Sequence, residues 1–179
     1  MKSQESKRRG PAAALSIALI FCGSFVSLGA EPPPLTEADA ERVLEEVNEP
    51  GAEVVLVNVW ATWCAPCIEE MPDLLRLRRE FRGLRLVLVS ADFESARQQV
   101  RERLAGLGVD FETFRRTGKD MEFINALDER WSGALPASFV YDGEGRLHHF
   151  EQGRASYEEF RKLILDVMDG DGSRAEEET

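Results

Sequence analysis

Two cysteines, Cys64 and Cys67, stand in the stretch W-C-A-P-C with two residues between them. Such a pair can bind a metal, form a structural disulfide or exchange disulfides with a partner. A structural zinc site needs about four ligands, but His148 and His149 are adjacent in a predicted strand and point to opposite faces. A structural disulfide across so short a loop restrains the unfolded chain little. The pair is therefore predicted to be redox-active, with copper(I) binding by both thiols as the alternative.

The sequence around the pair supplies a physical reason for redox chemistry. An apolar run at 54–60 ends just before the pair, and a helix is predicted to begin there. The sulfur of Cys64 would then lie near unpaired backbone N–H groups and the positive end of the helix dipole, which stabilise a thiolate. Pro66 suits the first helical turn. Cys67 lies one turn deeper, where it can attack a mixed disulfide, and Trp63 is expected to shield one side.

The elements that must position these residues follow from the apolar pattern. Continuous β-branched runs predict buried strands, and apolar residues at helical spacing predict amphipathic helices. Thr36 is the predicted N-cap of the first helix. We expect the first helix to run from this cap to about residue 48, further helices at 66–81, 94–107, 119–129 and 157–168, and strands at 54–60, 85–90, 109–114, 136–141 and 146–150. This order predicts an α/β fold with a central mixed sheet, a final antiparallel hairpin and helices on both faces.

The two ends of the chain differ from its middle. Residues 1–30 begin with basic residues and continue with an uncharged apolar stretch at 12–30, which predicts a signal peptide or an uncleaved N-terminal membrane anchor. Either places the rest of the chain in the periplasm or elsewhere outside the cytoplasm. Residues 31–34 form a proline-rich spacer. We expect one domain at 35–168 and a disordered acidic tail at 169–179.

The charge of the chain excludes one class of partner. Lys and Arg total 22 against 33 Asp and Glu, for a net charge of −11. A basic surface for nucleic acid is therefore not expected. The chain shows no heptad pattern, so we expect a monomer.

At this point the sequence shows a family resemblance. The run V-L-V-N-V-W-A-T-W-C-A-P-C-I-E-E-M-P resembles the active-site stretch of the thioredoxin superfamily, and more narrowly of its exported TlpA/ResA-like branch. The later run A-L-P-A-S-F-V-Y-D-G-E-G resembles the cis-proline loop and following strand of that family. The resemblance spans Leu35 to Met168 and is weakest between Phe111 and Ser132. It implies a thioredoxin-like fold.

The resemblance assigns roles residue by residue. It implies that Cys64 is the nucleophile, Cys67 the resolving thiol and Pro136 a cis-proline facing the disulfide. The backbone of Leu135 would pair with a substrate segment as a strand does, although many relatives carry Thr or Val there. The other residues expected to contact substrate are Trp63, Ala65 and Pro66.

Two polar positions near the pair bear on proton transfer. Asn58 stands where cytosolic thioredoxins carry a buried Asp, and an amide cannot titrate. Glu70 follows Cys67 by one helical turn, and ResA-like relatives have a Glu at this spacing. One interpretation makes Glu70 the proton acceptor for Cys67, with a pKa raised by partial burial. The other makes it an exposed helix glutamate, and the sequence leaves both open.

The resemblance implies an exported thiol–disulfide oxidoreductase. Cys64 would attack a partner disulfide, and Cys67 would release the reduced partner. Reduction is the usual direction in this family, for example in cytochrome c maturation. The implied partners are disulfide-bearing exported proteins and a membrane thiol reductase that supplies electrons. No cofactor is expected beyond the Cys64–Cys67 disulfide. A copper(I) chaperone stays the alternative, and peroxide reduction is a third possibility for which we identify no supporting Thr and Arg.

Overall fold

The computed structural model describes residues 32–177, with side chains through residue 170. The predicted signal or anchor segment at 1–30 lies outside the described residues. Within 32–177, none of the helices combines the length and apolar character that membrane crossing requires.

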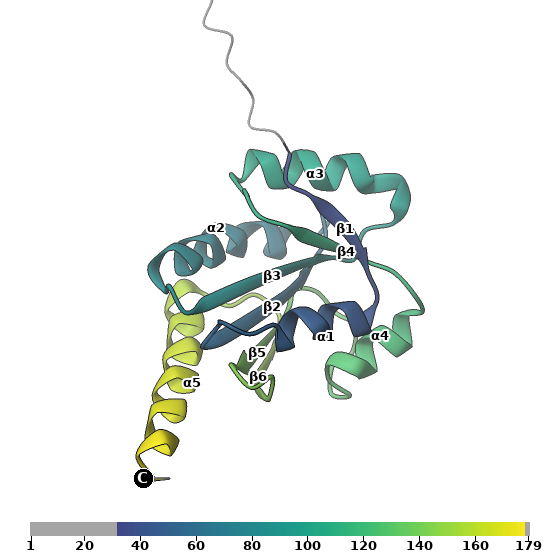
Figure 1. The fold of residues 1–179 in the computed structure, drawn as a ribbon. Coiled ribbons are helices and arrows are strands. Elements are labelled where there is room, and N and C mark those ends of the chain that lie inside the picture. Colours follow the sequence, from purple (N-terminus) through teal and green to yellow (C-terminus); the bar gives the residue numbers. More distant parts are fainter. Residues whose placement is uncertain (1–31, 178–179) are drawn as a thin grey trace, which may run out of the picture.

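A six-stranded mixed sheet forms the centre of the molecule (Figure 1). Its spatial order is β1-β4-β3-β2-β5-β6, with β1, β4, β3 and β2 parallel and β5 and β6 antiparallel to their neighbours. Every residue of β2 is buried, as its nearly continuous apolar sequence predicts for a central strand. The strands are β1 (Leu35–Ala38), β2 (Val54–Trp60), β3 (Leu84–Ser90), β4 (Thr113–Arg116), β5 (Ala137–Asp142) and β6 (Leu147–Gln152).

Helices cover both faces of this sheet and enclose two apolar cores. The helices are α1 (Ala40–Asn48), α2 (Ala65–Glu80), the 3₁₀ turn η1 (Glu94–Ala96), α3 (Arg97–Gly106), α4 (Asp120–Leu127) and α5 (Tyr157–Glu177). One core packs α2, α3 and α5 against the sheet, and the other packs α1 and α4. The predicted mixed sheet with helices on both faces is confirmed. The alternation of β2 sends Leu56 and Trp60 to the first core and Val57 to the second.

The first element differs from the prediction. Residues around Thr36 form strand β1, which pairs in parallel with β4, and the helix begins only after it. Asp39 is the N-cap of α1, because its carboxylate accepts a hydrogen bond from the backbone N–H of Arg42 at 2.9 Å. The short strand was missed because its partner β4 lies far along the chain.

Two further boundaries differ by four residues or more. Strand β4 begins at Thr113, four residues after the predicted start at Val109. Helix α5 continues to Glu177. Residues 169–177 are therefore helical, although the sequence analysis predicted a disordered tail from residue 169. Phe160, Ile164 and Val167 bury this helix against the first core. A helix held in this way extends at low cost, because each added residue gains one hydrogen bond.

Candidate active site

Cys64 and Cys67 form a disulfide at the junction of β2 and α2, with an S–S distance of 2.01 Å and Cα atoms 5.3 Å apart. Cys64 is the N-cap of α2, and its Sγ accepts a hydrogen bond from the backbone N–H of Cys67 at 3.3 Å. The N–H and the helix dipole favour negative charge on this sulfur once the disulfide opens. Cys64 is 5% exposed and Cys67 is fully buried, so Cys64 is the sulfur that a partner reaches first.

The rim of the site contains the residues predicted to contact substrate. Trp63 is 68% exposed, and Ala65 and Pro66 are exposed in the first turn of α2. The Leu135–Pro136 peptide bond is cis, as the resemblance implied. Val59 of β2 is the register partner of the residue after Pro136, so the cis bond lies at the end of β2 from which the disulfide turn emerges.

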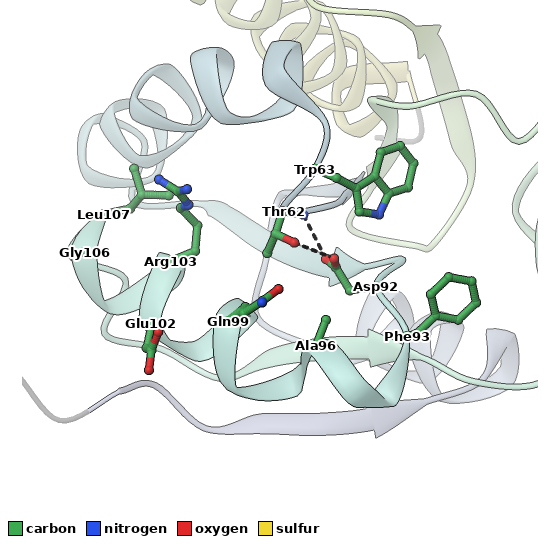
Figure 2. Close-up of a pocket in the computed structure, with 10 residues that line it drawn as sticks. All are labelled: Thr62, Trp63, Asp92, Phe93, Ala96, Gln99, Glu102, Arg103, Gly106 and Leu107. Atoms are coloured by element: carbon green, nitrogen blue, oxygen red, sulfur yellow. Dashed lines mark hydrogen bonds between the residues drawn. The ribbon is translucent and has the colours of Figure 1, made fainter.

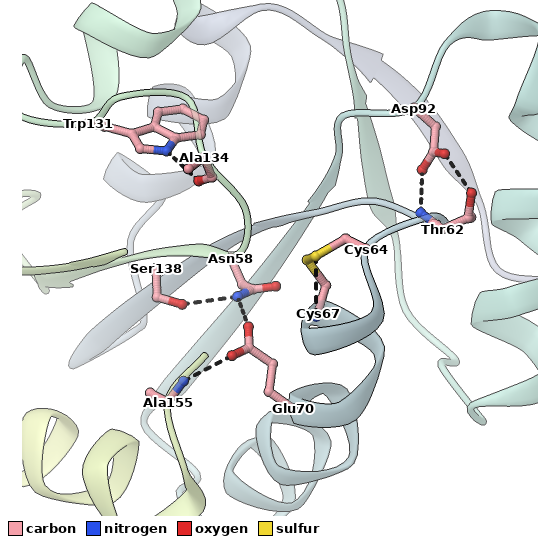
Figure 3. Close-up of a disulfide and its surroundings, with 10 residues drawn as sticks. All are labelled: Asn58, Thr62, Cys64, Cys67, Glu70, Asp92, Trp131, Ala134, Ser138 and Ala155. Carbon is pink, nitrogen blue, oxygen red and sulfur yellow. Dashed lines mark hydrogen bonds between the residues drawn. A yellow bond between two sulfur atoms is a disulfide. The ribbon is translucent and has the colours of Figure 1, made fainter. Parts of the chain in front are cut away.

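Glu70 lies on the buried side of α2. It is fully buried, and its carboxylate accepts hydrogen bonds from Asn58 Nδ2 at 2.8 Å and from the backbone N–H of Ala155 at 3.2 Å (Figure 3). Burial raises the pKa of Glu70 from 4.5 to about 7, against the lowering effect of these two hydrogen bonds. Glu70 is therefore not the exposed helix glutamate of the second interpretation, and its role as proton acceptor for Cys67 stays a prediction. A carboxyl group with this pKa can accept or release a proton near neutral pH.

A second buried carboxylate, which the sequence did not indicate, fixes the turn before Cys64. Asp92 is 3% exposed and follows β3. It accepts hydrogen bonds from the backbone N–H of Thr62 at 2.9 Å and from the Thr62 hydroxyl at 2.6 Å (Figures 2 and 3). It also accepts one from the Ser90 hydroxyl at 2.8 Å. Asp92 thereby holds the turn that presents Trp63. The sequence showed only that Asp92 follows a buried parallel strand, and this position does not reveal Thr62 as its hydrogen-bond partner.

An open cavity of about 650 Å³ lies beside this turn (Figure 2). Trp63 and Phe93 border it, and both are strongly exposed for aromatic side chains, at 68% and 80%. The remaining wall comes from one face of α3, including Gln99 and Arg103. The cavity therefore adjoins the turn that precedes Cys64, and neither active-site cysteine is among its lining residues.

The histidines take part in local hydrogen bonds away from the cysteines. His148 Nε2 lies 2.7 Å from a carboxylate oxygen of Asp142, and His149 Nε2 lies 2.8 Å from one of Asp166. The two side chains thus have different partners, as expected for adjacent strand residues. Among residues 32–177, no three or more His, Cys, Asp and Glu side chains are grouped to hold a metal ion.

Comparison with known proteins agrees with this geometry. The AhpC/TSA family profile matches residues 32–150. HelX, a thiol:disulfide interchange protein of Rhodobacter capsulatus, is 34% identical over 67% of this chain and 58% of its own. The chain thus spans less than two thirds of that relative. The thiol-disulfide oxidoreductase ResA of Bacillus subtilis is 25% identical over 72% of this chain and 69% of its own. A thiol:disulfide interchange protein of Chlorobium tepidum has the same fold, with a TM-score of 0.58 and 23% identity over 78% of this chain and 98% of its own.

The chain belongs to the AhpC/TSA family, within the thioredoxin-like proteins. Its relatives are named thiol-disulfide oxidoreductases and interchange proteins of the ResA and DsbE types. At the level of class it is a thiol–disulfide oxidoreductase, and its C-x-x-C pair, Cys64 and Cys67, is joined by a disulfide.

Proposed function

We propose that this protein acts outside the cytoplasm and reduces disulfides in exported partner proteins, as in cytochrome c maturation. The observation that carries the proposal is the asymmetry of the disulfide. Cys64 is reachable at the start of α2, whereas Cys67 is fully buried, one helical turn from a buried carboxyl group. This arrangement suits an attacking thiolate and a separate resolving thiol. The apolar stretch at 12–30 supports export or anchoring of the chain.

The proposed reaction begins with both cysteines reduced. The Cys64 thiolate attacks one sulfur of the partner's disulfide, forming a mixed disulfide and releasing the partner's other sulfur as a thiolate. Cys67 then gives its proton to the Glu70 carboxylate, and its thiolate attacks the Cys64 sulfur. The Cys64–Cys67 bond forms, the mixed disulfide breaks, and the partner leaves with two electrons and takes up protons on its thiolates. A membrane thiol reductase would restore the dithiol.

The surface around the disulfide offers two means of holding a partner. The backbone of Leu135, next to the cis bond, can pair with an extended segment on either side of the partner cysteine. Trp63 supplies a large exposed apolar contact beside Cys64. Ala65 and Pro66 are small and leave the sulfur accessible. The partner is therefore expected to present its disulfide in an extended segment rather than in a helix.

A trapping experiment tests this function. In the full chain with Cys22→Ser, Cys67→Ser leaves Cys64 without a resolving thiol. We expect it to form a lasting mixed disulfide with an oxidised peptide that carries the haem-attachment sequence C-x-x-C-H. The matched control adds Cys64→Ala and should trap nothing. Absence of the adduct, combined with copper(I) binding that needs both cysteines, would favour the metal-delivery alternative.

A further inference from the structure

Asn58 lies in the middle of the buried sheet, on the face that meets the disulfide. It is fully buried in β2. Its neighbours on the same face of the strand, Leu56 and Trp60, belong to the core cluster that contains both active-site cysteines. An amide at this position is removed from water entirely, so its hydrogen-bonding groups depend on protein partners.

Of the two polar atoms of the Asn58 side chain, only Nδ2 has hydrogen-bond partners among the described residues. Nδ2 donates to Glu70 at 2.8 Å and to the Ser138 hydroxyl oxygen at 3.0 Å. Within residues 32–177, no group donates to Oδ1, although the atom is buried. Figure 3 shows this oxygen on the side of the amide that faces the disulfide. A disulfide has no hydrogen to donate, so the oxidised protein leaves the acceptor unmet.

Reduction supplies the missing donor. When a dithiol donor reduces the disulfide, the S–S bond breaks and two electrons and two protons pass to the protein. The buried sulfur, Cys67, then carries a hydrogen in the cluster that contains Leu56 and Trp60, the neighbours of Asn58 on its face of β2. A thiol is a weak hydrogen-bond donor, but a buried carbonyl oxygen without a partner is costly in free energy. Even a weak donor therefore stabilises the protein at this position.

We propose that Asn58 Oδ1 accepts a hydrogen bond from the Cys67 thiol in the reduced protein, and that this bond favours the reduced state. Asn58 is then a positioning residue with two tasks. Nδ2 holds the carboxylate of Glu70, while Oδ1 holds the Cys67 proton until Glu70 takes it. The inference rests on redox cycling of Cys64–Cys67, which the proposed function requires, but not on the direction of electron flow.

The S–H stretching band in the infrared spectrum tests the bond directly. Cys22→Ser with Cys64→Ala leaves Cys67 as the only thiol of the full chain, which has three cysteines. We expect a band lowered in frequency by hydrogen bonding, and Asn58→Leu should move it to the frequency of an unbonded thiol. Ser138→Ala and Glu70→Gln keep Oδ1 and should leave the band lowered. A band that does not respond to Asn58→Leu, or one that moves with Glu70→Gln, overturns the proposal.

The redox equilibrium gives a second test that a purely structural role would not produce. With both active-site cysteines present, Asn58→Leu should shift the equilibrium about tenfold towards the disulfide, which lowers the reduction potential by about 30 mV. Asn58→Val, which suits a buried strand, provides the same test if the Leu variant does not fold. Ser138→Ala should keep the parent potential. An unchanged potential in a folded Asn58 variant contradicts the inference.

The two proposals fail separately. A moved S–H band with an empty Cys67→Ser trap keeps the hydrogen bond and overturns the proposed reductase. A filled trap with an unmoved band keeps the reductase and overturns the role of Asn58.

Discussion

Two buried carboxylates lie on either side of the disulfide turn, and their surroundings differ. Asp92 accepts three hydrogen bonds, two of them from hydroxyl groups and one from a backbone N–H. Glu70 accepts two, from an amide and a backbone N–H, and burial raises its pKa to about 7. The comparison indicates that the number and kind of hydrogen-bond donors around a buried carboxylate help to determine its role. Asp92 is suited to hold the turn, whereas Glu70 is suited to exchange a proton.

The largest expected effect is on the rate at which the mixed disulfide is resolved, and it comes from removing the carboxyl group of Glu70. Glu70→Gln keeps the shape of the side chain but removes the base, so resolution of the mixed disulfide should slow about 100-fold. Stopped-flow fluorescence of Trp63 can follow this step. Glu69→Gln is the matched control, because Glu69 is 63% exposed on the same helix. A rate for Glu70→Gln equal to that of the control would remove Glu70 from the chemistry.

The corresponding change at Asp92 should act on stability. Asp92→Ala leaves the buried donors of Thr62 and Ser90 without their acceptor, which is expected to cost about 3–4 kcal/mol in the free energy of unfolding. Urea denaturation measures this loss. Asp110→Ala is the control, because Asp110 is 81% exposed. If Asp92→Ala were as stable as the control but slow in exchange, the proposed division of roles would be wrong.

A smaller effect is the pH dependence that Glu70 contributes to stability. Its pKa is higher in the folded protein, so its contribution is fully present below pH 4.5 and is lost as the pH rises to about 7. Unfolding free energies of parent and Glu70→Gln, measured across this window, should differ by an amount that changes on the order of 2–3 kcal/mol. Parallel pH profiles would mean that burial does not shift the pKa of Glu70.

The smallest expected effect refines the role of Asp92. Thr62→Val removes the hydroxyl donor at 2.6 Å but keeps the backbone N–H donor. The free energy of unfolding should fall by about 1 kcal/mol, well below the loss in Asp92→Ala. Urea denaturation of both variants checks the ratio. A loss as large as that of Asp92→Ala would show that the hydroxyl, and not the backbone N–H, anchors the turn.

The sequence predicted the elements and residues whose signals are local. The apolar run of β2, the C-x-x-C pair and the start of α2 are contiguous, so their arrangement follows from neighbouring residues. Strand β1 was missed because Leu35 pairs with Thr113, far along the chain. Tertiary pairing of this kind overrides the local pattern that favoured a helix cap at Thr36.

The site shows the same division between local and distant signals. The burial of Glu70 depends on Asn58 from another element and on the backbone of Ala155, 85 residues away. The helical spacing of Glu70 showed which turn it occupies but not what packs against it. Asp92 gave even less indication, because its partner Thr62 is 30 residues distant.

The reduction potential of Cys64–Cys67 tests the central claim most directly. The full chain with Cys22→Ser would be equilibrated against glutathione or dithiothreitol, and the two redox states quantified. The account predicts a value near or below roughly −250 mV, similar to that of thioredoxin, as a dedicated reductant requires. A value near roughly −120 mV, similar to that of DsbA, would make the protein an oxidant and contradict the proposed direction of electron flow.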